Sequence, residues 1–347
     1  MSSYSPEPFL SKHDPFAGEK AYASRNPTER MTLFRAMRAV AGSSGDGPID
    51  WDATAEVAKA SARSGDLTLS ERERDGYAAD VRDARDRVRE VADIDFDLPE
   101  NIEVQHRHHW IDANVDTFRR VMAPIAEELG GPVPGLARSV NTGTTGAMLA
   151  FLGGNVLGQY DPLLLADESD HALYFLHPNI GRVAATLNVE TPRFRRWIAF
   201  HEVAHAAEFG AAPWLSELLE ERMREGVEGL TEGRFERDAL REVNVVMTAV
   251  EGYAELVMDR AFDDEYDDLR RKLDERRGGT TPVGKLVRRL LGFGMKRDQY
   301  ERGKAFFDAV ADDRGVHGAS AVWESPDHLP SDAELDDPAK WLARVPA

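Results

Sequence analysis

The sequence predicts a mainly helical α+β protein. Several segments repeat apolar residues at helical spacing between capping residues. One short stretch, residues 163–180, is instead typical of two strands joined by a polar turn. None of the 347 residues is Cys, and no segment has the length and apolar character of a membrane span. The first sixteen residues lack the basic and apolar regions of a secretory signal. We therefore expect a soluble, cytoplasmic protein without disulfides or thiol chemistry.

The charge is strongly acidic. Asp and Glu number 62 against 43 Lys and Arg, which gives a net charge of −19. Phosphate binding needs clustered cations, so this balance excludes nucleic acid and anionic membranes as expected partners. Only 8 of the basic residues are Lys, and Asp is as abundant as Glu. That combination predicts a halophilic protein adapted to a salt-rich cytoplasm, because screening by salt relieves acidic self-repulsion. The alternative is an ordinary acidic surface that maintains solubility.

The chain divides into an N-terminal arm, residues 1–48, and one domain, residues 49–347. The arm has no sustained apolar period and ends in a Gly- and Ser-rich turn. Two helices are expected next, over 50–64 and 70–92. Asp50 is placed to cap the first, and Ser70 with Glu73 forms a capping-box pattern for the second. A third helix is expected over about 112–129, ahead of a segment rich in small residues at 139–158 that lacks a phosphate-loop signature.

The second half begins with the expected antiparallel hairpin, whose turn is placed at Asp167–Asp170. Its second strand includes Leu173–Leu176, and an edge strand beside a metal site can hold an extended peptide. The dipeptide Thr191–Pro192 predicts a helix start, and Gly210 its end. Further helices are expected over 235–262, 282–291 and 297–311, followed by an irregular tail.

The motif that carries chemistry is HEVAH at 201–205. Positions i and i+4 of a helix share one face, so His201 and His205 can bind one zinc ion together. Glu202 then lies beside the open position of the metal, where it can take a proton from a bound water. The alternative is a pair of surface histidines on an amphipathic helix. The apolar residues around the motif favour a buried site, so the sequence predicts a zinc-dependent hydrolase.

A third ligand is required, and Glu251 is the leading candidate. It lies four residues before Glu255 within an otherwise apolar helix, where a carboxylate needs a partner. We expect Glu251 to bind the metal and Glu255 to orient His201 or His205 by hydrogen bonding. Surface ion pairs are the alternative for both acids. Glu208, His171 and His177 are rival ligands, although Glu208 is so close in sequence that it would crowd the helix.

These motifs resemble the zincin-like metallopeptidase type 2 family. The resemblance covers roughly residues 49–347. It implies a zincin-like metallopeptidase fold with the short hairpin beside the HExxH helix, and one branch of the family is associated with biosynthesis of a deazaflavin coenzyme. The family pattern has Gln in place of Glu208 and His in place of Tyr253, which argues against either residue as an inherited ligand. The matching segments are LYFLHPNI and PWL around the HEVAH helix, WIDANVDTFRR at 110–120, NVLGQYDP at 155–162, EGYAELVMD at 251–259, KRDQYERGKAFFDAV at 296–310 and residues 322–345.

The expected activity is hydrolysis of a peptide or amide with one Zn²⁺ ion as cofactor and Glu202 as the base. Tyr253 or His177 is a candidate for stabilising the oxyanion. The alternative function is a non-catalytic, zinc-stabilised interaction protein linked to coenzyme biosynthesis. An intact Glu202 argues against it, because a structural zinc site has no use for a base beside the metal. The sequence specifies neither the substrate nor the oligomeric state.

Overall fold

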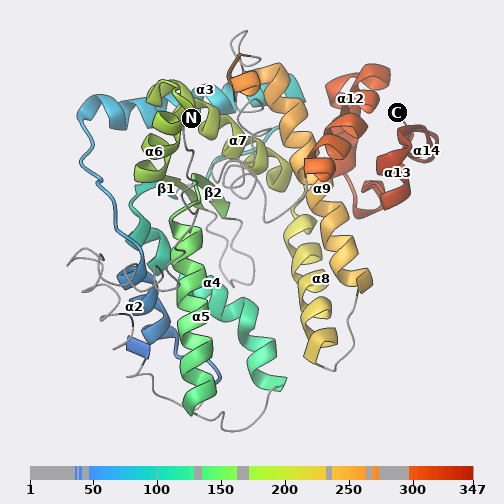
Figure 1. The fold of residues 1–347 in the computed structure, drawn as a ribbon. Coiled ribbons are helices and arrows are strands. Elements are labelled where there is room, and N and C mark those ends of the chain that lie inside the picture. The colour runs from blue at the N-terminus through green and yellow to red at the C-terminus, as the bar shows by residue number, and fades with distance from the viewer. Residues whose placement is uncertain are drawn as a thin grey trace, which may run out of the picture.

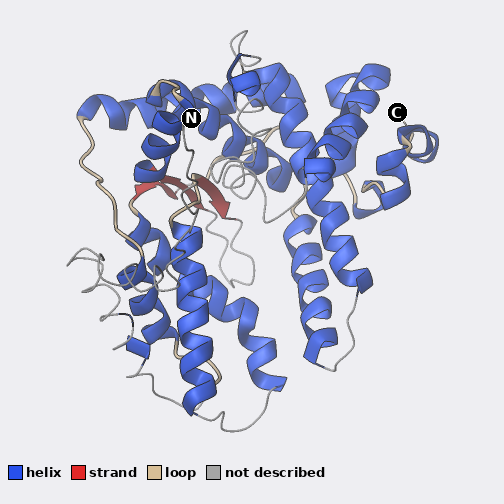
Figure 2. Ribbon diagram, viewed as in Figure 1, coloured by secondary structure: helices blue, strands red, loops and turns tan. Residues whose placement is uncertain are grey.

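Helices make up most of the chain in the computed structural model, and a small sheet lies among them (Figures 1 and 2). The structure describes residues 36, 39, 40, 47–99, 101–128, 135–161, 172–231, 237–262, 268–272 and 297–346. Within these residues, none of the helices combines the length and the apolar character that crossing a bilayer requires. The mainly helical α+β class predicted from the sequence is confirmed.

Three long helices contribute to the main core: α3 (Glu71–Ala92), α7 (Thr191–Ala211) and α9 (Arg237–Ala261). The capping box predicted for α3 is present, with the Ser70 hydroxyl facing the N–H of Glu73 and the Glu73 carboxylate accepting from the N–H of Ser70. The Thr-Pro pattern predicts Thr191 as the N-cap of α7 and Pro192 as its first helical residue. In the structure Thr191 is the first helical residue and Glu190 is the N-cap. Both α3 and α9 pack against α7, so the HEVAH motif lies inside the core.

The sheet has three strands in the order β1–β3–β2: β1 (Asn101–Gln105), β2 (Gly158–Asp161) and β3 (Ala172–Leu176). Strands β2 and β3 pair antiparallel, with Tyr160 opposite Leu173, whereas β1 and β3 pair parallel. The expectation that Leu173–Leu176 is an edge strand is therefore wrong. Strand β1 was not expected, and it covers the outer side of β3. The edge strand next to α7 is β2.

The expected hairpin differs in its limits. Residues 162–171, which include the expected first strand and the turn at Asp167–Asp170, lie outside the described residues. The strand ends at Leu176, and α6 (His177–Leu187) begins immediately, with Pro178 in its first turn. Residues 177–180 are therefore helical and not part of the hairpin.

A second apolar cluster joins three helices at one end of the molecule: α2 (Trp51–Ser61), α4 (Arg107–Glu128) and α5 (Gly135–Gly153). Asp50 caps α2 as predicted, accepting from the N–H of Ala53 at 2.9 Å. Helix α4 begins five residues before the expected start at 112. The arm is described only at residues 36, 39, 40 and 47–48, and the expected helix over 282–291 lies outside the described residues.

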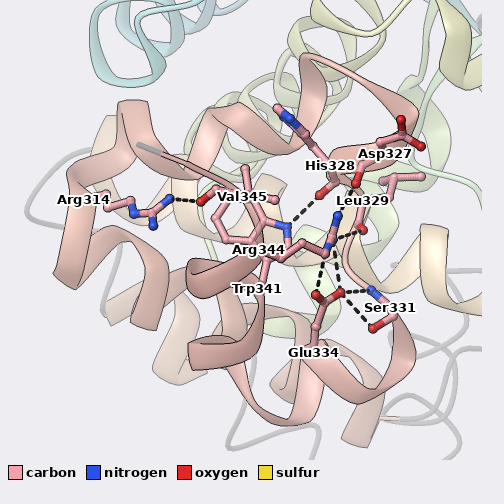
Figure 3. A network of polar contacts seen from close by, with 9 residues as sticks. All are labelled: Arg314, Asp327, His328, Leu329, Ser331, Glu334, Trp341, Arg344 and Val345. Carbon is pink, nitrogen blue, oxygen red and sulfur yellow. Dashed lines mark hydrogen bonds and ion pairs between the residues drawn. The ribbon is translucent and has the colours of Figure 1, made fainter.

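The C-terminal part packs against the outer side of α9. Helix α12 (Arg297–Ser320) lies along α9 and is interrupted at Gly315, whose φ is 76°. Arg344 and Ser331 both bind the carboxylate of Glu334, and the Trp341 indole donates to the His328 carbonyl at 2.7 Å (Figure 3). This network ties the last residues together over α12. The remaining elements are α8 (Trp214–Thr231), two 3₁₀ turns (Ala321–Trp323 and Pro326–His328), α13 (Asp332–Asp336) and α14 (Pro338–Arg344).

Candidate metal centre

Helix α7 places two imidazoles side by side. The Nε2 atoms of His201 and His205 are 3.3 Å apart, and the two rings meet edge to face. The indole of Trp197, one turn earlier, stacks on the His201 ring with an interplanar angle of 4°. Such packing limits rotation of the His201 side chain. The i, i+4 spacing therefore places the two Nε2 atoms close enough together to bind one ion.

Helix α9 adds a carboxylate to this pair. The Oε2 atom of Glu251 lies 3.9 Å from Nε2 of His201. One ligand atom from each of His201, His205 and Glu251 lies within 4.8 Å of the others. The three side chains are buried or nearly so. Helices α7 and α9 thus bring together the three residues expected to hold the metal.

The side chain of Glu202 extends from α7 to strand β2 of the sheet. Its Oε2 atom accepts a hydrogen bond from the backbone N–H of Tyr160 at 2.9 Å. Its other oxygen lies against Gly158, where an added Cβ would be only 2.5 Å from Oε1. Burial raises the pKa of Glu202 to about 8, and the hydrogen bond from the Tyr160 N–H acts in the opposite direction.

Glu208 contacts the site from the opposite side of His205. Its Oε2 atom lies 2.8 Å from Nδ1 of His205, and the side chain is completely buried. An oxygen bound at Nδ1 is on the far side of the imidazole from Nε2, so this geometry does not support Glu208 as a rival ligand. Burial raises the pKa of Glu208 well above its ordinary range. The i, i+3 spacing of His205 and Glu208 indicates such a contact, although Glu208 was predicted from the sequence only as a rival ligand.

The donor set fits a zinc ion. Two imidazole nitrogens and one carboxylate oxygen are a ligand set that catalytic zinc sites use, with a fourth position left open. Burial lowers the pKa of His205 to about 4, which favours the neutral, metal-binding imidazole. In the described part of the chain, no Lys or Arg forms an ion pair with Glu202 or Glu208. Buried acids without a cation are unfavourable, and a divalent ion beside them would offset that cost.

The chain is similar to known proteins in both sequence and structure. The sequence profile of the zincin-like metallopeptidases matches residues 49–236 and 223–342. The chain belongs to the zincin-like metallopeptidase family. It is also similar to a crystal structure from Chloroflexus aurantiacus described as a "putative hydrolase with a novel fold", with 30% sequence identity and a TM-score of 0.70. That match covers 85% of this chain and 98% of the other. No curated protein matches the sequence.

Membership of the zincin-like metallopeptidase family confirms the resemblance drawn from the sequence motifs. Together with the hydrolase neighbour, it supports metal-dependent hydrolysis in general. Zinc is the ion that the family implies, and His201, His205 and Glu251 form the group in the described structure that is able to bind it. The division into an arm and a domain stays a prediction.

The remaining expected residues of this zincin-like chain have other contacts. Glu255 forms an ion pair with Arg270, whose Nη1 lies 3.2 Å from Oε2. The Tyr253 hydroxyl shares a hydrogen bond with Ser320 on α12 at 2.7 Å, and burial raises the pKa of Tyr253. Neither contact involves the three candidate ligands, so the roles expected for Glu255 and Tyr253 stay predictions.

Of the two rival histidines, the structure describes only His177. His177 is the first residue of α6, and its Nδ1 lies 3.0 Å from the hydroxyl of Tyr77 on α3. The contact between Tyr77 and His177 joins α3 to the start of α6. His171 lies outside the described residues. The oxyanion role considered for His177 stays a prediction.

Proposed function

We propose that the protein is a single-zinc hydrolase that cleaves peptide or amide bonds, with Glu202 as the general base. The observation that carries the proposal is the position of Glu202 on α7. It directly follows His201 in the chain, and it is buried and held by the Tyr160 N–H. His201, His205 and Glu251 would hold the ion. When bound, zinc would supply Lewis acidity that polarises both the attacking water and the substrate carbonyl.

The residues of the chain account for the movement of protons. Glu202 removes a proton from the attacking water while the oxygen forms a bond with the carbonyl carbon. As the carbon–nitrogen bond breaks, Glu202 returns that proton to the departing nitrogen. The products are a carboxylic acid and an amine, which exchange a proton to give a carboxylate and an ammonium ion, and Glu202 ends in its starting state. The hydrogen bond from Tyr160 keeps the carboxylate directed toward the same place during both transfers.

An extended peptide is the substrate shape that the sheet favours. Strand β2 lies at the edge of the described sheet and packs against α7. An extended chain can add to an exposed edge strand through backbone hydrogen bonds. On that basis the substrate would lie along Gly158–Asp161, beside Glu202. This assigns to β2 the role that the sequence analysis gave to Leu173–Leu176.

The test compares the wild type with Glu202→Gln. Both proteins are assayed for zinc content by mass spectrometry and for cleavage of a peptide library. We expect the variant to keep its zinc and to lose hydrolysis by roughly 10²–10⁴-fold, because the base is removed and the ligands are not. Loss of zinc from the variant would make Glu202 a ligand and would overturn the mechanism. If both proteins bind zinc and neither cleaves any peptide, the non-catalytic, zinc-stabilised interaction protein becomes the better account.

A further inference from the structure

The contact between His205 and Glu208 is the basis of a second assignment. Both residues lie on α7, three positions apart, and Glu208 Oε2 is 2.8 Å from Nδ1 of His205. Glu208 has 0% of its surface exposed. Its second oxygen, Oε1, is buried and has no hydrogen-bond partner within the described part of the chain. The imidazole of His205 is therefore the polar side chain that the carboxyl group contacts, and the backbone N–H of Ala254 on α9 also interacts with it.

This contact determines which nitrogen of His205 is available. Nε2 points toward His201, at 3.3 Å, and Nδ1 points toward Glu208. An imidazole that binds a metal through Nε2 carries its hydrogen on Nδ1, and that hydrogen needs an acceptor. Glu208 provides the acceptor in a fixed position, because helix α7 holds both residues in one rigid element.

Glu208 is costly for the stability of the fold. Its neighbours on α7 are Ala204, Ala206 and Ala207, all at most 1% exposed, and Val203 is fully buried. A buried carboxyl group with an unsatisfied oxygen is less favourable there than an apolar side chain of similar volume. A residue that costs stability at such a position is typical of a functional site. Its function is therefore sought at its closest polar side-chain contact, His205.

We infer that Glu208 is a positioning residue for the metal centre: it accepts the Nδ1–H of His205 and thereby directs Nε2 toward the ion. The inference rests on the proposed zinc site. It gives Glu208 the kind of role that the sequence analysis assigned to Glu255. The contact at Nδ1 of His205 is made by Glu208, so an orienting role for Glu255, which pairs with Arg270, stays a prediction for His201.

The experiment uses two substitutions with different hydrogen-bonding capacity. Glu208→Gln retains an amide oxygen that can accept from Nδ1, whereas Glu208→Leu retains the volume and removes the acceptor. The control is Glu334→Gln, which changes another buried acid, one that is bound by Ser331 and Arg344 in the C-terminal network (Figure 3). Zinc affinity is measured by competition with a chelator, the absorption spectrum by substitution with Co²⁺, and stability by melting of the metal-free protein.

We expect Glu208→Leu to weaken zinc binding by about 10–100-fold and to alter the Co²⁺ spectrum. Glu208→Gln should restore most of the affinity and the wild-type spectrum, because the acceptor is back in place. The metal-free Glu208→Leu protein should melt at or above the wild-type temperature, since a buried carboxyl group has gone. Glu334→Gln should show the reverse, a lower melting temperature with unchanged zinc affinity.

Three results would overturn the inference. Unchanged zinc affinity and an unchanged Co²⁺ spectrum in Glu208→Leu would show that His205 needs no such acceptor. Equal weakening by Gln and by Leu would show that hydrogen-bond acceptance is not the reason. A wild-type protein that binds no zinc would overturn both this inference and the proposed function. The first two results leave the proposed function intact, because neither depends on hydrolysis.

Discussion

The backbone N–H of Tyr160 and the carboxylate of Glu202 form a 2.9 Å hydrogen bond that joins strand β2 to helix α7. The strand carries no acid or base of its own at this contact, yet it determines where the proposed base lies. Gly158, two residues earlier, leaves room for the same carboxylate. The short sheet therefore has a task beyond packing, because it positions Glu202.

Replacement of Gly158 tests this arrangement. An added Cβ would lie 2.5 Å from Glu202 Oε1 and 2.8 Å from its Cδ, so Gly158→Ala must displace the carboxylate. We expect kcat to fall by roughly 10²-fold, since displacements of about 1 Å have that effect, with zinc content unchanged. Gly181→Ala on α6 is the matched control, because its Cβ meets nothing within 4 Å. Full activity in Gly158→Ala would show that Glu202 is not held as we describe.

The third ligand can be tested by substitution of the two acids on α9. Glu251 lies beside His201, whereas Glu255 pairs with Arg270. Glu251→Ala should abolish tight zinc binding, and Glu255→Ala should weaken it by about 10–100-fold, the usual range for a residue that supports a ligand. Metal analysis of both purified variants shows which substitution removes more zinc. The reverse order would remove Glu251 from the ligand set and leave the HExxH pair.

The close contact between α9 and α12 predicts that a larger residue in place of Gly252 lowers the stability of the protein. A Cβ on Gly252 would lie 2.4 Å from the backbone carbon of Gly303, so the two helices meet at their backbones. Gly252→Ala should lower the stability by about 1–3 kcal/mol, because α9 and α12 must separate. Gly135→Ala at the start of α5, where a Cβ meets nothing, is the control. Melting curves of Gly252→Ala and Gly135→Ala measure the difference in stability. Equal curves would contradict a close backbone contact between α9 and α12.

The acidic composition predicts a dependence on salt. At a net charge of −19, screening by added KCl should reduce repulsion among the surface carboxylates. We expect the melting temperature to rise as KCl reaches the molar range. Thermal unfolding in a KCl series measures this. A melting temperature that falls steadily would favour the ordinary acidic surface over adaptation to a salt-rich cytoplasm.

Several features of the site were predictable because they depend on neighbours in the chain. The spacing of His201 and His205 places both rings on one face of any helix that contains them. The capping box of Ser70 and Glu73 is likewise a local pattern, and both residues form it as expected. Glu251 and Glu255 both lie in an apolar helix, where a carboxylate needs a partner, and Glu251 was preferred as the ligand because it is the first acid of the E-x-x-x-E spacing. The structure brings its Oε2 to within 3.9 Å of His201.

Other features required knowledge of which elements meet. Gly252 directly follows Glu251 in the chain, yet it faces Gly303 on α12. Residue spacing gives the side of a helix on which Gly252 lies, but not which helix packs there. Strand β1 was missed for a similar reason. Its partner β3 is 71 positions away in register, and a parallel pair leaves no turn signal between its strands.

The sequence by itself determined the helical character of the chain, the HExxH pair and the position of Glu202 between its histidines, because each follows from periodicity and spacing within one helix. Tertiary structure alone decided that β2 and not β3 lies at the sheet edge beside Glu202, that Glu208 binds Nδ1 of His205, and that Glu255 pairs with Arg270. These contacts depend on the burial of α7 between α3, α9 and the sheet. Packing of distant segments selects one partner among several that the local pattern allows equally.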